Sequence, residues 1–151
     1  PEFKGITPFA QGDGPLWATG MPPETMFSVY GSGHVGIFGA IIQPTNGEKI
    51  LRIDCVATDM FQQQKAYPTY LFYNPYPAIK NITTDVGSQV VDIYDAVNRT
   101  LIKKDAKGNV SFDISADGAR VLVYVPAGSK FKISNGVLLA NNLAVDYRYG
   151  R

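Results

Sequence analysis

The sequence has one cysteine, one histidine and almost no net charge. The single cysteine, Cys55, excludes an internal disulfide, and one cysteine with one histidine is too few for a zinc site built within the chain. Fourteen basic residues against thirteen acidic ones give a net charge of +1. This balance offers no concentrated basic face, so we expect no nucleic-acid partner. No apolar run reaches the ~18 residues of a membrane-spanning helix, so we expect no membrane partner either.

Glutamate is scarce, and the aspartates fall mainly at turns and strand ends, where Asp caps the local backbone. Asp92 and Asp95 stand three apart in a strand-like segment, so they are predicted to point to opposite faces. They therefore do not form the carboxylate pair of a glycosidase. The cofactor prediction is none, with one alternative left open. That alternative is a structural calcium ion bound by Asp and loop carbonyls, although no EF-hand spacing supports it.

The length of 151 residues suits one domain with a proper core. Residues 1–21 are dense in glycine and proline and are predicted to form an extended arm. They lack the basic segment followed by an apolar one that marks a signal peptide. Thr25–Ile42 is apolar but interrupted by glycines, which is compatible with a buried helix or a buried strand. We divide the chain into 1–48, the arm and apolar segment, and 49–151, a β domain.

From Ile50 onward, short β-rich segments alternate with turn residues at a spacing typical of an antiparallel sandwich. The predicted fold is therefore mainly β, an antiparallel β-sandwich. Val110–Ile114 alternates apolar and polar residues, as in a strand with one buried face. Val121–Val125 is apolar throughout and is predicted to be a central strand covered on both faces.

Aromatic residues are the first candidate for a binding site. Tyrosines crowd one ten-residue stretch, as Tyr67, Tyr70, Tyr73 and Tyr76, and Trp17 lies in the arm. Because aromatic faces stack on the C–H faces of sugar rings, these residues predict a carbohydrate-binding platform. The alternative is that the tyrosines fill the sandwich core with their hydroxyls at its edge, and that Trp17 only fastens the arm.

His34 is the one weak catalytic candidate. It stands among glycines, in Gly31–Gly36, where a ligand could approach the backbone closely. The alternative is a structural histidine in a tight turn. Cys55 lies in an apolar, strand-like stretch, so we predict that it is a small buried hydrophobic residue.

Four segments carry a resemblance to a known class of enzymes. They are Leu71–Tyr76 with an Asn-Pro turn, Val91–Val97 with a Tyr-Asp pair, the alternating Val110–Ile114, and Ala119–Gly128 ending in Pro-Ala-Gly. In this order they resemble the C-terminal β-sandwich of secreted polysaccharide-degrading enzymes such as glycoside hydrolases. The tail, Ile133–Leu138 with Leu143–Tyr147, resembles the strand that leads to a next module.

The resemblance implies a role as well as a fold. In such enzymes the sandwich packs on a catalytic barrel, so residues 1–48 are expected to be the end of that module and the chain a piece of a larger or nicked enzyme. The first expectation is thus a secreted, non-catalytic sandwich whose partner is the catalytic module or a companion polypeptide. The second is a carbohydrate-binding module that holds polysaccharide through surface aromatics. The third is that His34 contributes to the active site of a nicked glycoside hydrolase.

Overall fold

The structure, a computed structural model, describes residues 38–57 and 65–150. The chain divides into two compact units, Pro1–Ile41 and Ile42–Arg151. Residues 38–41 form one helical turn. The arm, residues 1–21, and the apolar segment as far as residue 37 lie outside the described residues. The second unit begins at Ile42 because its first strand pairs with the next one, Ile42 opposite Ile53.

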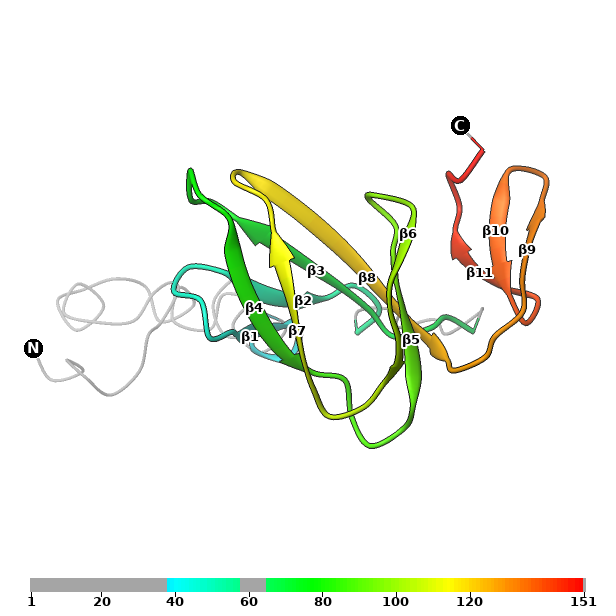
Figure 1. Ribbon diagram of the computed structural model, residues 1–151, viewed down its shortest axis with the longest axis horizontal. Helices are drawn as coiled ribbons and strands as arrows, with labels where there is room; N and C mark the ends of the chain where they lie inside the picture. The colour runs from blue at the N-terminus through cyan, green and yellow to red at the C-terminus, as the bar shows by residue number, and fades with distance from the viewer. Residues whose placement is uncertain (1–37, 58–64, 151) are drawn as a thin grey trace, which may run out of the picture. The chain divides into compact units, whose positions relative to one another are not determined.

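The second unit is mainly antiparallel β, as predicted, and is sandwich-like (Figure 1). All strand pairs among its described residues are antiparallel. The strands in the described residues are β1 (Ile42–Pro44), β2 (Leu51–Asp54), β3 (Thr69–Asn74), β4 (Lys80–Asp85), β5 (Val91–Asp95), β6 (Thr100–Ala106), β7 (Asn109–Ile114), β8 (Gly118–Pro126), β9 (Phe131–Ser134), β10 (Val137–Ala140) and β11 (Leu143–Asp146).

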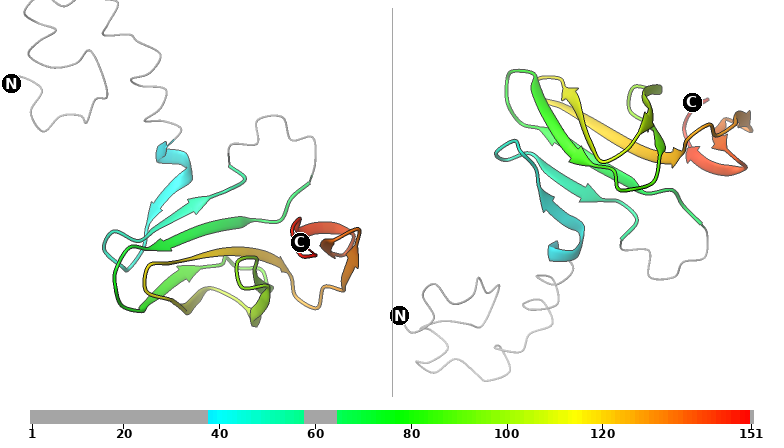
Figure 2. Two further views of the ribbon diagram at one scale, coloured as in Figure 1. Left: turned by 90° about the horizontal axis from the view of Figure 1, so that it is seen from above. Right: turned by 60° about the horizontal axis from the view of Figure 1, so that its bottom comes forward.

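The strands form three sheets. Six of them lie in the order β1-β2-β3-β8-β5-β6, while β4 pairs with β7 and the last three run in the order β11-β10-β9. Figure 2 shows the β4–β7 pair as a layer beside the large sheet, and the β9–β11 meander at one end of β8. The long strand β8 returns between β3 and β5, so the centre of the large sheet is built from segments far apart in the sequence.

The main core lies between the large sheet and the β4–β7 pair. β7 alternates exposed and buried positions along its whole length, which confirms the period-two prediction for Val110–Ile114. The rings of Phe72 on β3 and Phe112 on β7 meet edge to face, with their centroids 5.1 Å apart. Burial of apolar side chains of this size stabilises the fold by ~1.5–3 kcal/mol each. The buried residues of this core are Ile50, Phe72, Ile82, Ile93, Ala106, Val110, Phe112, Ile114, Leu122 and Tyr124.

A second cluster covers the other face of β5 and β8. Its buried residues are Tyr94, Val123, Val125, Leu138, Ala140 and Val145. Leu122 and Tyr124 thus enter the first core, while Val123 and Val125 enter the second. This division confirms that Val121–Val125 belongs to a central strand covered on both faces, since Leu122, Val123, Tyr124 and Val125 are all buried.

The turn after β3 is fixed by one buried side chain. Asn74 is fully buried, and its side-chain amide donates to the carbonyl oxygens of Ala78, Ile114 and Ser115 at 2.8, 3.2 and 2.8 Å. Its Oδ1 accepts a hydrogen bond from the backbone N–H of Tyr76. The Asn-Pro signal in the sequence therefore marks a turn that is fixed by hydrogen bonds of the buried Asn74 side chain.

Candidate functional site

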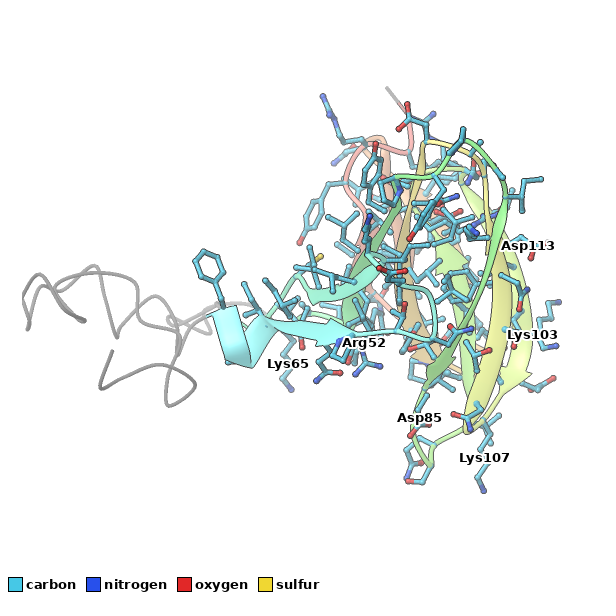
Figure 3. All side chains as sticks on the ribbon, turned by 90° about the vertical axis from the view of Figure 1, so that its left-hand side faces the viewer. Arg52, Lys65, Asp85, Lys103, Lys107 and Asp113 are labelled. Carbon is cyan, nitrogen blue, oxygen red and sulfur yellow. The ribbon has the colours of Figure 1, made fainter. Side chains whose placement is uncertain are left out.

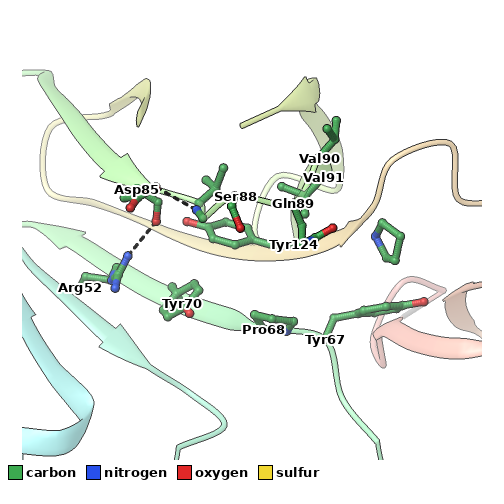
Figure 4. Close-up of a pocket in the computed structure, with 13 residues that line it drawn as sticks. Arg52, Tyr67, Pro68, Tyr70, Asp85, Ser88, Gln89, Val90, Val91 and Tyr124 are labelled. Atoms are coloured by element: carbon green, nitrogen blue, oxygen red, sulfur yellow. Dashed lines mark hydrogen bonds between the residues drawn. The ribbon is translucent and has the colours of Figure 1, made fainter. Parts of the chain in front are cut away.

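A groove of about 600 Å³ opens beside the first core, within the range of ~300–1,000 Å³ that ligand pockets occupy. Its lining combines aromatic and apolar side chains with one cation and one carboxylate (Figure 4). The lining residues are Arg52, Tyr67, Pro68, Tyr70, Asp85, Val86, Gly87, Ser88, Gln89, Val90, Val91, Tyr124 and Pro126.

Strand alternation places two tyrosines side by side in this groove. Tyr70 of β3 lies opposite Leu122 of β8, so Tyr70 and Tyr124 project to the same face of the sheet. Their ring centroids are 5.0 Å apart and the ring planes are tilted by 46°. The backbone N–H of Tyr124 donates to the Pro68 carbonyl at 2.9 Å, which fixes the two strands at this point.

Arg52 completes the stack. Its Cζ lies 4.7 Å from the centroid of the Tyr70 ring, a cation–π contact. Its Nη1 donates to Thr84 Oγ1 and to the Asp85 carbonyl, both at 3.1 Å, and its Nη2 donates to Gln43 Oε1. The guanidinium is therefore held between β1 and β4. Among the described residues, one ion pair is found, between Arg120 and Asp95. No carboxylate of the described residues therefore lies within 4.0 Å of the Arg52 guanidinium.

Tyr124 is the most deeply buried tyrosine of the groove. Tyr124 is 5% exposed, and its hydroxyl has no hydrogen-bond partner among the described residues. Burial raises the pKa of Tyr124 to about 12, and Thr84 and the charge of Arg52 offset only part of that rise. The hydroxyl oxygen is closed to solvent, so a ligand in the groove would contact it only if neighbouring side chains moved.

The loop from β4 to β5 forms one wall of the groove. Asp85 Oδ1 accepts a hydrogen bond from the N–H of Gly87 at 2.8 Å. Gly87 has φ +91°, a conformation that residues with a Cβ rarely adopt. The Gly108 N–H donates to the Gly87 carbonyl, so the β6–β7 turn supports this loop. Figure 3 shows Asp85 and Lys107 at the end of the sandwich where the two turns meet.

The structure separates the four tyrosines that the sequence grouped as a platform. Tyr67 and Tyr70 line the groove, and the Tyr67 hydroxyl donates to the Ala140 carbonyl at 2.9 Å. Tyr73 projects to the opposite face of β3 from Tyr70, is 48% exposed and donates to Asp117. Tyr76 donates to the Glu48 carbonyl and lies beneath the ammonium of Lys80. Trp17 and His34 lie outside the described residues.

The prediction for Cys55 is wrong. Cys55 is exposed, because β2 ends at Asp54 and Cys55 lies beyond the strand. Partial desolvation, together with the carboxylate of Asp54, raises the pKa of the Cys55 thiol above its ordinary value. A raised pKa lowers the thiolate fraction near neutral pH, which makes this thiol a weaker nucleophile.

Asp92 and Asp95 project to opposite faces of the sheet, as their spacing predicted. Asp92 lies opposite Val125 of the second cluster, and Asp95 lies opposite Leu122 of the first core. The Asp92 carboxylate accepts hydrogen bonds from the N–H groups of Asp105 and Gly128. No cluster of three or more His, Cys, Asp or Glu side chains suited to a metal ion occurs in residues 38–57 and 65–150. The calcium site stays a prediction.

Two residues that dominate the groove, Arg52 and Tyr124, were not singled out from the sequence. A signal existed for Tyr124, because a tyrosine inside an apolar central strand needs a partner for its hydroxyl.

In the described part of the chain, no helix has both the length and the apolar character to cross a membrane. Comparisons with protein-family models, with curated proteins and with solved structures give no match to this chain.

Proposed function

We propose that residues 42–150 form an accessory β-sandwich of a secreted polysaccharide-degrading enzyme, and that the groove binds a sugar unit of the polysaccharide. The observation that carries this proposal is the groove itself, where Tyr70 and Tyr124 stand side by side next to a fixed guanidinium. Sugar rings combine apolar C–H faces with a rim of hydroxyls. Aromatic rings beside hydrogen-bonding groups match both features.

The polar groups of the groove fit the rim of a sugar. Arg52 supplies N–H donors, and the Asp85 carboxylate supplies acceptors. Arg52 and Asp85 belong to different strands, and the hydrogen bond from Arg52 Nη1 to the Asp85 carbonyl holds these strands together. A site that is already fixed loses less conformational entropy when it binds a ligand.

We expect Tyr70→Leu to weaken polysaccharide retention by about fivefold, the equivalent of the ~1 kcal/mol that an aromatic contact contributes beyond its buried area. Leucine keeps apolar contact with the first core but removes the ring. The measurement is affinity electrophoresis of the purified chain in gels that contain soluble polysaccharides, alongside a thermal melt.

The matched control for this variant is Tyr73→Leu. Tyr73 is on the same strand but projects to the opposite face. Its variant should migrate as the wild type does. If both variants lose retention equally, or if neither loses any, the groove is not the sugar site.

A second candidate function is packing on the catalytic module or on a companion polypeptide. It is favoured by the apolar residues on the face of the large sheet opposite the first core. Ile53 and Leu71 are paired there on β2 and β3, and Leu51 and Tyr73 on the same strands are 40% and 48% exposed. Exposed apolar side chains that lie together often mark an interaction surface.

We expect the chain, when purified from its natural source, to elute in size exclusion together with a larger polypeptide. Leu51→Glu combined with Tyr73→Glu should release it, because a charge in an apolar interface must be desolvated. Ile79→Glu, at a position that is 66% exposed, is the control and should leave elution unchanged. Elution of the wild type alone, as a folded chain of 16.5 kDa, would contradict this role.

A further inference from the structure

We propose that Asn135, in the turn between β9 and β10, is a site of spontaneous covalent modification, where the side-chain amide is lost and an isoaspartate forms. Neither Asn135 nor Gly136 lines the groove, so this site is separate from the proposed sugar site. Three features of the described residues support it: the Asn-Gly sequence, the backbone conformation of the turn, and the hydrogen bonding of this pair compared with a second Asn-Gly pair in the chain.

The reaction needs only these two residues and water. The backbone nitrogen of Gly136 attacks the side-chain carbonyl carbon of Asn135. A carbon–nitrogen bond forms, the bond to the side-chain nitrogen breaks, and ammonia leaves with the proton of the Gly136 N–H. Water then opens the resulting succinimide ring at either carbonyl, which gives aspartate or isoaspartate without any oxidation or reduction. Glycine hinders this attack least, because it has no Cβ.

The attack requires a particular backbone angle at Asn135. Its φ of +50°, followed by +76° at Gly136, is typical of a type I′ turn, in which the first central residue has a ψ of about +30°. That ψ directs the Gly136 nitrogen away from the Asn135 side chain. The nitrogen comes next to Cβ at a ψ of about −120°, which is the value at the same position of a type II′ turn.

Rotation of a single peptide unit converts one turn into the other. Types I′ and II′ both have a positive φ at the first central residue, and both close a two-residue hairpin. The pairing of Ser134 with Val137 therefore stays in place while the peptide between Asn135 and Gly136 rotates (Figure 1). Gly136 can take the negative φ that type II′ requires, because glycine populates both signs. The hairpin thus reaches the reactive geometry without unfolding β9 or β10.

No hydrogen bond within the described part of the chain opposes this rotation. Asn135 is exposed, and neither its side chain, its carbonyl oxygen nor the Gly136 N–H makes a hydrogen bond with a described residue. The Gly136 carbonyl oxygen accepts a hydrogen bond from the Gly150 N–H at 3.0 Å. That oxygen belongs to the next peptide unit, so this bond is kept.

The second Asn-Gly pair, Asn46-Gly47 between β1 and β2, is held in place. The Gly47 N–H, which would be the nucleophile, donates to Thr45 Oγ1 at 3.1 Å. The Asn46 side chain accepts a hydrogen bond from the Thr83 N–H at 2.8 Å and donates to the Asn81 carbonyl at 3.4 Å. Attack at Asn46 must therefore disrupt these bonds, which makes it an internal control with the same dipeptide.

The modification acts on the turn that sets the register of β9 against β10. Aspartate keeps the backbone and adds one negative charge. Isoaspartate sends the backbone through the side chain, which lengthens the turn by one carbon atom. A two-residue type I′ turn matches the twist of its strands only at its normal length, so isoaspartate should loosen the pairing of Ser134 with Val137.

The test is incubation of the purified full chain in a mildly alkaline, non-denaturing buffer, followed over time by peptide mapping with mass spectrometry. An isoaspartyl methyltransferase is the probe for isoaspartate. We expect Asn135 to lose its amide at least about tenfold faster than Asn46, because the hydrogen bonds at Asn46 must break first. In urea the two sites should react at similar rates, since each asparagine is followed by glycine.

Two variants test the cause. Asn135→Gly removes the reacting side chain and keeps the turn, because Gly-Gly also forms type I′ turns. It should remove the isoaspartate that accumulates in the folded wild type. Thr45→Ala releases the Gly47 N–H and should speed the reaction at Asn46. A thermal melt verifies that each variant is folded.

Equal rates at Asn135 and Asn46 in the folded chain, or a faster rate at Asn46, would overturn the proposal. An Asn135 that stays intact in the folded chain while it reacts in urea would also overturn it, because the turn would then protect the residue. Loss of the amide without isoaspartate would exclude attack by Gly136. None of these results bears on the groove, which the Tyr70→Leu variant tests separately.

Discussion

We expect Val123→Asp to leave the chain unfolded at 25 °C. Val123 is 3% exposed and lies in the second cluster, on a strand that pairs with β3 on one side and with β5 on the other. The substitution loses ~1.5–3 kcal/mol of apolar burial. It also places a carboxylate where no water can reach it, which costs several kcal/mol more. Together these losses approach the ~5–15 kcal/mol that stabilises a typical domain.

Circular dichroism and a urea titration measure this effect directly. Val97→Asp is the control, because Val97 is 50% exposed and the new carboxylate stays hydrated. The control should melt within a few degrees of the wild type. A cooperative transition for Val123→Asp near the wild-type midpoint would mean that β8 is not the central strand.

The second large effect is expected for Arg120→Met. Asp95 is fully buried, and its carboxylate accepts hydrogen bonds from the Val97 N–H, the Asn98 amide and Arg120, with a distance of 2.5 Å to Arg120 Nη1. Methionine keeps much of the apolar stem but leaves the carboxylate without its counter-ion. Removing one partner of a buried ion pair costs ~3–5 kcal/mol.

A second substitution separates the charge from the packing. Arg120→Met combined with Asp95→Asn removes the uncompensated charge, so part of the lost stability should return. Lys103→Met, at an exposed position on β6, is the control for the loss of a cation and should change the free energy of unfolding by less than ~0.5 kcal/mol. A loss below ~1 kcal/mol for Arg120→Met alone would contradict the role of this pair.

Prediction from the sequence worked best where one strand carries a complete signal. The alternation of Val110–Ile114 indicates a strand with one buried face, and the continuous apolar stretch Val121–Val125 indicates a strand with two buried faces. The opposite directions of Asp92 and Asp95 likewise follow from the period of a single strand. Each of these predictions depends only on the residues of one strand, and the structure confirms all three.

The tail of the chain, which was likened to the strand that leads to a next module, folds as the three-stranded sheet β11-β10-β9. β9 and β10 are separate strands joined at Asn135-Gly136, whose φ angles are +50° and +76°. Two successive positive φ values are typical of a type I′ hairpin turn, and Asn-Gly is the sequence that favours it most. The sequence therefore carries the signal for this turn.

The candidate site was predictable only in part. The tyrosine-rich stretch led to Tyr67 and Tyr70, yet it also included Tyr73 and Tyr76, which lie elsewhere. Sequence proximity groups residues that strand alternation then sends to opposite faces. Tyr70 and Tyr73, three apart on β3, therefore project to opposite faces of the sheet.

The sequence by itself determined a mainly β chain, the central strand and the directions of side chains along each strand, because these depend on local periodicity and turn residues. The tertiary structure decided the groove. Arg52, Asp85 and Tyr124 come from β2, β4 and β8, and they meet only because β8 inserts between β3 and β5 while β4 pairs with β7 in a separate layer. Strand order depends on which apolar faces cover one another across the whole chain, and it cannot be inferred from any single segment.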